Sequence, residues 1–287
     1  MRIAFIGLGV MGYPMAGHLA AAGHDMRVFN RSPEKAQAWV AEHGGEAAGS
    51  AATAVSDREA VALCVGNDHD LLQCLHQILP SLPRGGLIID HTTISARLAR
   101  DSAVQARDHG LAFVDAPVSG GQTGAQAGAL SIMAGGDDEA VARAEPIMAA
   151  YAKAIRRIGG PGSGQLCKMV NQIAIAGLLQ GLAEAAHFTA RAGLDSQAVY
   201  EAISMGAAQS WQMDNRWKTI MAGEFDFGFA VDWMRKDLGL VLDEARANGA
   251  RLEGTALVDQ FYAELQAMGG RRWDTSSLAA RLERRRV

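Results

Sequence analysis

A stretch near the middle of the chain places three polar side chains at a spacing that suits a catalytic site. Lys168, Asn171 and Gln172 stand at positions i, i+3 and i+4 of an apolar run over residues 165–192. The run has helical length and contains no proline, so we expect a helix that carries these side chains on one face. Such a stripe would complete a catalytic site if the rest of the chain binds a cofactor. The alternative is that this face of the helix lies in water.

A dinucleotide-binding motif opens the chain. Residues 2–6 predict a short buried strand, residues 15–22 a helix, and residues 26–29 a second strand. The turn after the first strand is a G-x-G-x-x-G motif formed by Gly7, Leu8, Gly9, Val10, Met11 and Gly12. Its first two glycines permit a tight turn and a close approach to a pyrophosphate, and the third permits close packing of helix on strand. The alternative is an ordinary glycine-rich turn.

The end of the second strand should contact the ribose of the cofactor. An NAD site usually has Asp or Glu there, whereas this chain has Asn30, Arg31 and Ser32. Asn30 carries no charge that would repel a phosphate, Arg31 can bind one through two hydrogen bonds, and Ser32 adds a hydroxyl donor. These residues favour NADP over NAD. They can equally form a turn before a helix that Ser32 caps, and the two interpretations are compatible.

Strand and helix patterns continue to alternate as far as residue 158. Further strands are expected at 60–65, 87–90, 112–115, 130–134 and 155–158, and further helices at 69–79, 95–109 and 138–151. This alternation predicts an α/β fold with a Rossmann-type, doubly wound parallel sheet. Ligands of such sheets bind beyond the carboxyl ends of the strands, so residues 65–67 and 91–93 are candidate nicotinamide-side contacts. The alternative for Asn67 and His91 is a polar loop without a function.

A candidate anion-binding segment follows the strand at 112–115. Ser119, Gly120 and Gly121 offer a hydroxyl and two unobstructed backbone N–H groups in a row. This arrangement suits a small carboxylate. The alternative is a flexible loop that needs glycine for its backbone conformation.

The composition changes sharply at residues 159–164, which are rich in glycine, and no strand pattern follows. We therefore expect a dinucleotide-binding domain over residues 1–162 and an all-helical domain over residues 163–287. Within the second domain, Gly193 and Asp195 should end one helix and begin the next. Lys236 and Asp237 lie in a helical stretch and are either a surface pair or part of the site.

Composition excludes several classes of function. The 287 residues carry 27 basic and 31 acidic side chains, so nucleic acid is not an expected partner. The dense basic cluster of Arg281, Arg284, Arg285 and Arg286 is typical of a solvated helix end. Polar residues interrupt the apolar run after Lys168, so no membrane span is expected. The three cysteines match no zinc or redox motif, and we expect no metal and a reducing, cytoplasmic location.

Four segments together resemble the β-hydroxyacid dehydrogenase family, and the resemblance covers essentially the whole chain. These segments are the glycine-rich turn with Met15, residues 115–121 with Gly124 and Ala125, Gly162 and Gly164 with Lys168 and Asn171, and residues 236–238. The family includes 3-hydroxyisobutyrate dehydrogenase, tartronate semialdehyde reductase and the glyoxylate/succinic semialdehyde reductases. Four such segments in this order are far more specific than any one of them.

The resemblance implies a role for each matching residue. Lys168 would be the general acid and base, and Asn171 would help to orient the substrate. Ser119, Gly120 and Gly121 would bind the substrate's carboxylate. Gln172 would also bind the substrate; it is the residue found at this position in tartronate semialdehyde reductases, where many relatives have Asn. The implied cofactor-binding residues are Gly7, Leu8, Gly9, Val10, Met11, Gly12, Asn30, Arg31, Ser32, Val65, Gly66, Thr93 and Lys236.

The chain departs from the family's pattern at several positions. His91 stands where the family usually has Ser, and residues 65–66 are Val-Gly in place of the common Leu-Pro. These positions line the nicotinamide side of the site. The segment around Trp211 also differs and can shape an unusual pocket.

The implied activity is reversible hydride transfer between NADP, which is preferred, or NAD and a small 3-hydroxy acid or its semialdehyde. The implied partners are this small carboxylate substrate and further copies of the chain, in a homodimer or homotetramer. An imine reductase on the same scaffold is one alternative, although such members generally lack the lysine that Lys168 matches. A non-catalytic cofactor-binding module is the other, and it would have lost Lys168, Asn171 or residues 119–121.

Overall fold

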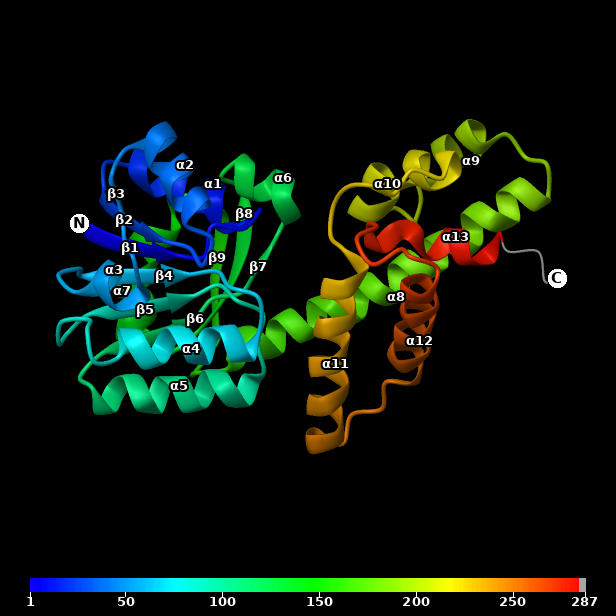
Figure 1. Ribbon diagram of the computed structural model, residues 1–287. Coiled ribbons are helices and arrows are strands. Elements are labelled where there is room, and N and C mark those ends of the chain that lie inside the picture. Colours follow the sequence, from blue (N-terminus) through cyan, green and yellow to red (C-terminus); the bar gives the residue numbers. More distant parts are fainter. Residues whose placement is uncertain (284–287) are drawn as a thin grey trace. The chain divides into compact units, whose positions relative to one another are not determined.

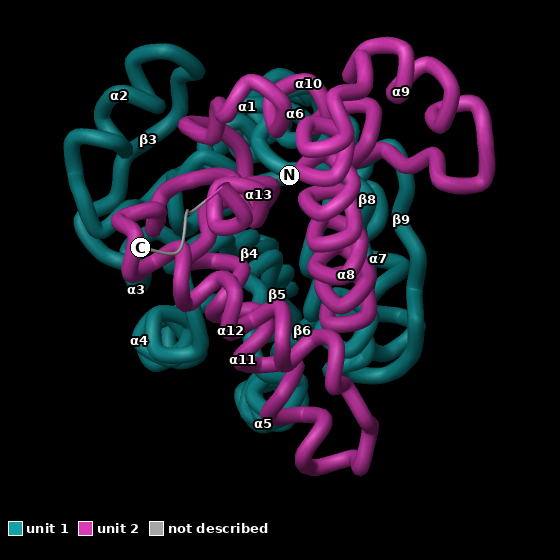
Figure 2. The backbone as a smooth tube through the Cα atoms, turned by 90° about the vertical axis from the view of Figure 1, so that its right-hand side faces the viewer, with its two compact units in different colours: residues 1–168 teal, residues 169–287 magenta. Residues whose placement is uncertain are grey.

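A computed structural model describes residues 1–283, and its chain forms two compact units (Figures 1 and 2). The first unit, Met1–Lys168, combines a sheet with helices, and the second begins at Met169 and is helical. The expected fold class is therefore confirmed. Arg284, Arg285 and Arg286 of the predicted basic cluster lie outside the described residues.

The first unit is built on a sheet whose first six strands run parallel in the order β3-β2-β1-β4-β5-β6. This is the strand order of a Rossmann fold. The six strands are β1 (Arg2–Ile6), β2 (Asp25–Phe29), β3 (Glu46–Ala47), β4 (Ala60–Leu63), β5 (Leu87–Asp90) and β6 (Ala112–Asp115). The sequence pattern predicts all of them except β3, which has only two residues.

Beyond β6 the sheet continues through three strands of mixed direction. They are β7 (Val118–Ser119), β8 (Leu130–Gly135) and β9 (Ala152–Gly159). Strand β8 runs antiparallel to β6 and β7, and β9 runs parallel to β8. An antiparallel neighbour needs no long crossover helix, so the six-residue helix α6 (Gly121–Gln126) suffices before β8.

Helices cover both faces of the sheet, as Figure 1 shows. Besides α6 they are α1 (Gly12–Ala21), α2 (Pro33–His43), α3 (Ala51–Val55), α4 (Asp68–Ile78), α5 (Ala96–Asp108) and α7 (Asp138–Met148). The sequence of strand β4 is continuously apolar because both of its faces are buried. Ala60 and Ala62 pack in the core on one face, while Val61 and Leu63 pack in the core on the other.

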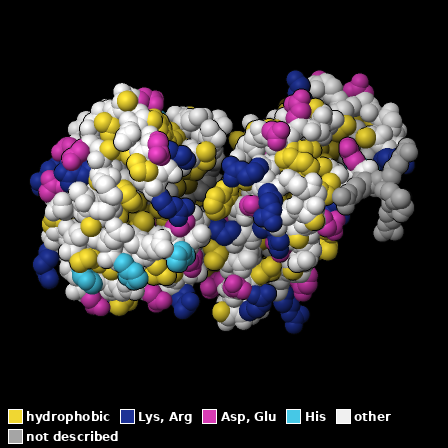
Figure 3. Space-filling view, viewed as in Figure 1, with side chains coloured by type: hydrophobic (Ala, Val, Ile, Leu, Met, Phe, Trp, Pro, Cys, Tyr) yellow, Lys and Arg dark blue, Asp and Glu magenta, His cyan; other side chains and the backbone are white. Residues whose placement is uncertain are grey.

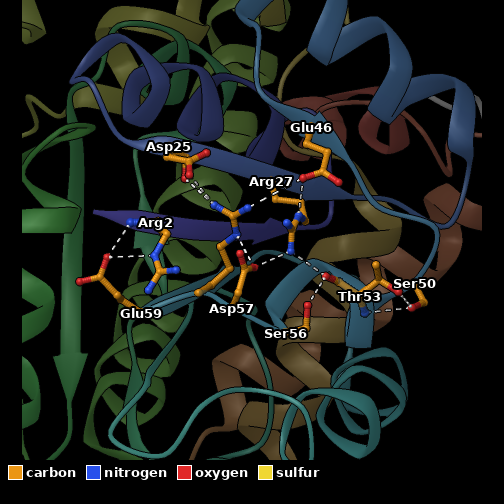
Figure 4. Close-up of polar contacts among 10 residues, drawn as sticks. Arg2, Asp25, Arg27, Glu46, Ser50, Thr53, Ser56, Asp57 and Glu59 are labelled. Atoms are coloured by element: carbon orange, nitrogen blue, oxygen red, sulfur yellow. Dashed lines mark hydrogen bonds and ion pairs between the residues drawn. The ribbon is translucent and has the colours of Figure 1, made fainter.

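An ion-pair network joins the amino ends of the strands, at the edge opposite the expected ligand site (Figure 4). Arg58 is only 4% exposed, and its guanidinium lies 3.0 Å from Asp25 and 3.2 Å from Asp57. Arg27 pairs with Glu46 at 2.8 Å and with Asp57 at 2.6 Å. The network thus connects β2 and β3 with Asp57 and Arg58, which lie just before β4.

The second unit consists of helices around one apolar core. They are most of α8 (Ser163–Arg191), α9 (Ser196–Ile203), α10 (Trp211–Ala222), α11 (Val231–Asn248), α12 (Glu253–Ala267) and α13 (Leu278–Leu282), with a 3₁₀ turn at Thr275–Ser277. Trp217, Met234 and Tyr262 pack in this core. Asp195 caps α9 as expected, because its side chain accepts the N–H of Ala198 over 2.8 Å.

Helix α8 crosses from the first unit into the second. The chain divides after Lys168, whereas the composition break placed the boundary after residue 162. The difference arises because the start of α8 is bonded to the sheet: the N–H of Gln165, in its first turn, and the N–H of Gly162, just before the helix, both donate to Asp115. Within residues 1–283, α8 is the one helix long and apolar enough to cross a membrane, a test that the core helix of a soluble protein also passes. That the chain has no membrane-spanning segment therefore stays a prediction.

Candidate active site

The glycine-rich turn has the shape of a dinucleotide cradle. Gly7 has a φ of +95°, and a Cβ there would collide with the carbonyl oxygen of Cys64. A Cβ on Gly12 would collide with the carbonyl oxygen of Gly7, so helix α1 can pack closely on the turn only because Gly12 is glycine. No described atom lies within 4 Å of the place where a Cβ on Gly9 would sit. These features fit a pyrophosphate that approaches the backbone at Gly9 and the start of α1.

The three residues expected at the ribose have separate surroundings. Asn30 Oδ1 accepts the N–H of Leu8 over 2.9 Å, and its Nδ2 donates to the carbonyl oxygen of Ser32 over 3.1 Å. The side chain of Arg31 is 85% exposed and lies 3.2 Å from Asp70. Ser32 stands at the N-cap of α2, but its hydroxyl bonds to no described N–H group of that helix, so the expected capping bond is absent. Asn30 therefore supports the glycine-rich turn, while Arg31 extends outward.

The loops after β4 and β5 are bonded to one another at the carboxyl edge of the sheet. The N–H of Val65 donates to Thr92 Oγ1 over 3.1 Å, and the N–H of Thr92 donates to Asp90 over 3.0 Å. The side chain of Asn67 caps helix α4 by accepting the N–H of Asp70 over 3.0 Å. Asn67 thus has a structural role, whereas the loop that carries Thr93 is held at the edge where a nicotinamide is expected.

The side chain of His91 belongs to the core rather than to a ligand site. It is 2% exposed, and burial lowers the pKa of its imidazole to about 4, so the ring is neutral. Nδ1 lies 2.7 Å from the carbonyl oxygen of Ala116, which can only accept, so the proton is on Nδ1. Nε2 then accepts from the hydroxyl of Tyr151 over 2.9 Å. Both interpretations of His91 are therefore wrong: its buried side chain is neither placed for a nicotinamide contact nor part of a polar loop without a function.

Lys168 lies beside the segment expected to bind the substrate. Its side chain is 8% exposed, and Nζ donates to the carbonyl oxygen of Val118 over 2.9 Å. Val118 is followed by Ser119, the last residue of β7, and by Gly120 and Gly121 at φ angles of +133° and +60°. The predicted catalytic lysine and the predicted anion-binding segment, 50 residues apart in the sequence, are therefore neighbours.

Two buried aspartates stand side by side next to this segment. Asp90 and Asp115 are register partners at the carboxyl ends of β5 and β6. Asp115 accepts the N–H of Gly162 over 2.7 Å and that of Gln165 over 3.0 Å, which fixes the start of α8. Burial raises the pKa of each carboxyl group to about 7, although the hydrogen bonds that each one accepts oppose this shift.

The polar residues expected in the second unit form one chain of contacts. Asn171 Nδ2 donates to Gln172 Oε1 over 2.8 Å, and Gln172 Nε2 donates to Asp237 Oδ2 over 2.6 Å. Lys236 Nζ lies 3.1 Å from Asp237 Oδ1. Gln172 and Asp237 are each 2% exposed. Two alternatives are therefore wrong: the stripe on α8 does not face water, and residues 236 and 237 are not a surface pair.

Gln165 was missed as a candidate site residue, and Asp237 was left as either a surface residue or part of the site. Asp237 binds Gln172, and the side chain of Gln165 binds the loop around Thr93. One signal for Gln165 was available, because it lies three residues before Lys168 and so extends the polar stripe by one turn. Asp237 carried no comparable signal in its spacing.

Comparison with known proteins agrees with this geometry. Residues 2–160 match the family described as the NAD binding domain of 6-phosphogluconate dehydrogenase. Residues 162–282 match the family described as NAD-binding of NADP-dependent 3-hydroxyisobutyrate dehydrogenase.

Full-length relatives are similar as well. An uncharacterized oxidoreductase of Shewanella frigidimarina (strain NCIMB 400) is 55% identical, over 99% of both chains. The 2-hydroxy-3-oxopropionate reductase of Escherichia coli (strain K12) is 33% identical, over 99% of this chain and 97% of that protein. The solved structure of Mycobacterium tuberculosis 3-hydroxyisobutyrate dehydrogenase with L-serine superposes with a TM-score of 0.91 at 32% identity, covering 99% and 100% of the two chains.

The imine reductases are more distant. An imine reductase from Pseudomonas sp. covers 98% of this chain with a TM-score of 0.61 at 22% identity, which shows a likeness of fold alone. Lys168, Asn171 and residues 119–121, on which the resemblance to the hydroxyacid dehydrogenases rests, are all present in the chain. Both halves of the chain and its full-length relatives lead to the same assignment: the chain belongs to the β-hydroxyacid dehydrogenase family.

Proposed function

We propose that this enzyme, an NAD(P)-dependent oxidoreductase of the hydroxyacid dehydrogenase class, reduces a small semialdehyde acid reversibly with Lys168 as the general acid and base. One observation carries the proposal. The buried Nζ of Lys168 lies 2.9 Å from the carbonyl oxygen of Val118, which adjoins Ser119 and the two glycines after it. A proton donor is thus held beside a hydroxyl and a glycine-rich backbone suited to a carboxylate.

In the first unit, some residues would bind the cofactor and others the substrate. Gly9 and the start of α1 would hold the pyrophosphate, and the loop that carries Thr93 would lie at the nicotinamide end. The nicotinamide, when bound, supplies or accepts the hydride. Ser119 binds and orients the substrate's carboxylate, together with the main chain at residues 120 and 121. Lys168 donates a proton to the carbonyl oxygen in reduction and takes it back in oxidation.

The proposed substrate is a small 3-hydroxy acid or its semialdehyde. The relatives' names support this class, since 3-hydroxyisobutyrate and 2-hydroxy-3-oxopropionate are both short acids with an oxygen function at the third carbon. NADP is the proposed cofactor. Arg31 supports it, because it is an exposed guanidinium directly after β2 and no acidic residue stands at positions 30–32.

A direct spectrophotometric assay, which follows the absorbance of the reduced nicotinamide, tests the proposal. NADPH or NADH would be combined with glyoxylate, succinic, tartronate and methylmalonate semialdehyde. Wild type should oxidise the nicotinamide with at least one of them, faster with NADPH. Lys168→Ala should lose roughly 10²- to 10⁴-fold in kcat, the range for removal of a general acid or base. Lys153→Ala, an exposed lysine in β9, is the matched control and should behave as wild type. If wild type binds NADPH and reduces none of the four aldehydes, the proposal fails.

We also propose that the chain acts as a homodimer or homotetramer in the cytoplasm. Large apolar side chains on one side of α8 are exposed, among them Val170 at 64% and Phe188 at 70%. Hydrophobic side chains also gather on the face of the helical unit that Figure 3 shows. The thiols of Cys64, Cys74 and Cys167 form no disulfide in the described chain, which suits a reducing compartment. Sedimentation equilibrium would reveal a monomer if the oligomer proposal is wrong.

A further inference from the structure

The buried side chain of Gln165 takes no part in the reaction proposed above, yet both ends of its amide are engaged. Gln165 lies in the first turn of α8 and is fully buried. Its Nε2 donates to the carbonyl oxygen of Thr92 over 2.7 Å, and its Oε1 accepts the N–H of Ile94 over 3.1 Å. A buried amide with donor and acceptor both in use is held in one orientation. Gln165 therefore binds the main chain on both sides of Thr93.

The loop between β5 and α5 is fixed at each end by other side chains. At its start, the N–H of Thr92 donates to Asp90 over 3.0 Å. At its end, Asp68 accepts both the N–H of Ser95, over 3.0 Å, and the hydroxyl of Ser95, over 2.6 Å. Gln165 holds the middle of the loop from a different element, 71 residues further along the chain than Ile94.

The next turn of α8 carries Lys168, the proposed acid and base. Lys168 follows Gln165 by three residues, which puts both side chains on one face of the helix. The main chain of Gln165 is bonded to Asp115, and Lys168 Nζ is bonded to the carbonyl oxygen of Val118. The positions of Lys168 and of the loop around Thr93 are therefore connected through Gln165.

We propose that Gln165 is a positioning residue for hydride transfer, because its amide joins the loop at the nicotinamide end to the helix turn that carries Lys168. This inference rests on the proposed function, which places the nicotinamide at the loop around Thr93 and assigns the proton to Lys168 on α8. Reaction needs the donor carbon, the carbonyl carbon and the proton donor in one geometry, and a misplacement of 1 Å can lower the rate about 100-fold. Gln165 acts on this geometry without touching substrate or cofactor.

The test replaces the amide by an apolar side chain of similar size. Gln165→Met should fold and bind NADPH within about threefold of wild type, while kcat falls about 10- to 100-fold. The isotope effect on kcat with NADPH deuterated at the transferred position should rise, because hydride transfer would become slower than product release. Gln77→Met, at an exposed glutamine of α4, is the matched control and should change neither value. If Gln165→Met does not fold, Gln165→Glu keeps the acceptor for Ile94 but places a carboxyl oxygen against the carbonyl oxygen of Thr92, and it should show the same two effects.

Hydrogen exchange supplies a readout that needs no turnover. In Gln165→Met, the Ile94 amide should exchange at least about tenfold faster than in wild type, because it has lost its acceptor. Unchanged exchange would refute the tie between α8 and the loop. A folded variant with wild-type kcat, or one in which kcat and NADPH affinity fall by the same factor, would overturn the positioning role. If wild type reduces no semialdehyde while exchange at Ile94 still rises, the proposed reaction fails, and with it the catalytic part of this inference.

Discussion

Arg31 Nη1 lies 3.2 Å from Asp70 Oδ1, so the arginine expected to select NADP already has an anionic neighbour. Asp70 belongs to the first turn of α4, the helix that follows β4. The side chain of Arg31 is 85% exposed, and an ion pair so open to water contributes at most about 1 kcal/mol. A 2′-phosphate can therefore compete for Arg31, but the carboxylate of Asp70 would repel it.

Cofactor preference should respond to both members of this pair. Arg31→Ala should weaken NADPH binding about tenfold and leave NADH binding nearly unchanged, since only NADPH has the 2′-phosphate. Asp70→Asn should strengthen NADPH binding a few-fold, and more at low salt, because it removes a like charge. Titration of cofactor fluorescence measures both, with NADH as the internal control. If Arg31→Ala lowers the affinity for NADPH and NADH equally, Arg31 does not bind the 2′-phosphate.

Asp237 should prove necessary for the site of the second unit. Asp237→Asn removes the charge beside Lys236 and leaves an amide that can meet Gln172 with either end. We expect a loss of roughly 1–3 kcal/mol in the free energy of unfolding and a rise in KM. Urea denaturation and steady-state kinetics measure the two effects. Asp243→Asn, an exposed aspartate of the same helix, is the control and should change neither.

Gly164 should tolerate no side chain. A Cβ there would collide with the carbonyl oxygen of Met133 and lie 2.6 Å from that of Asp115. Because both obstacles are backbone, Gly164→Ala should lower the free energy of unfolding by roughly 2 kcal/mol or more. Gly254→Ala is the control in an exposed first turn of α12, where no described atom lies within 4 Å, and it should be neutral or stabilising by up to about 1 kcal/mol. Equal melting temperatures for the two variants would contradict the packing seen at α8.

Buried Asp90 should make stability fall as the pH rises. Its pKa is raised to about 7, so between about pH 4 and 7 the folded protein keeps a proton that the unfolded chain releases. This contribution is complete below about pH 4 and is lost as the pH rises through 7. His91 has the opposite sign, since its pKa is lowered to about 4 and its contribution is lost as the pH falls from about 6.5 to 4.

The variant Asp90→Asn isolates this aspartate, because Asp115, whose pKa is also raised to about 7, and His91 are present in both proteins. Between pH 5 and pH 8 the variant should gain roughly 3 kcal/mol in unfolding free energy relative to wild type, at about 1.4 kcal/mol for each unit of pKa. Urea denaturation at several pH values measures this difference. A difference that stays constant over this range would show that the carboxyl group titrates near its ordinary pKa.

Local patterns in the sequence were enough to predict most of the fold. Strands β4 and β5 are buried on both faces, so their residues form unbroken apolar runs that can be recognised without partners. The glycine-rich turn is also recognisable locally, because its three glycines lie within six residues. A Cβ would collide with backbone at Gly7 and Gly12, while Gly9 leaves open space. The two-residue β3 and the mixed edge beyond β6 depend on pairing with distant strands, which a local pattern does not reveal.

The site was only partly predictable, and the missing parts are long-range contacts. Lys168 was found because its helix is apolar and its neighbours are amides. The burial of Asp237 follows from Gln172, 65 residues earlier, and the role of Gln165 follows from Thr92, 73 residues earlier. Residues this far apart meet only in the folded chain, so no spacing rule could have joined them.

The path of α8 limits how the protein can be dissected. A fragment cut at the glycine-rich break after residue 162 would delete Gln165 and Lys168 and leave Asp115, buried at the sheet edge, without one of its backbone donors. A fragment that keeps the nucleotide-binding half intact must extend at least to Lys168, and it would then end inside a helix, with the last carbonyl groups unpaired. The chain therefore cannot be divided into two independent modules at residue 162. A chimera that exchanges helical domains should be joined within α8 after Lys168 rather than at the glycine-rich residues 159–164.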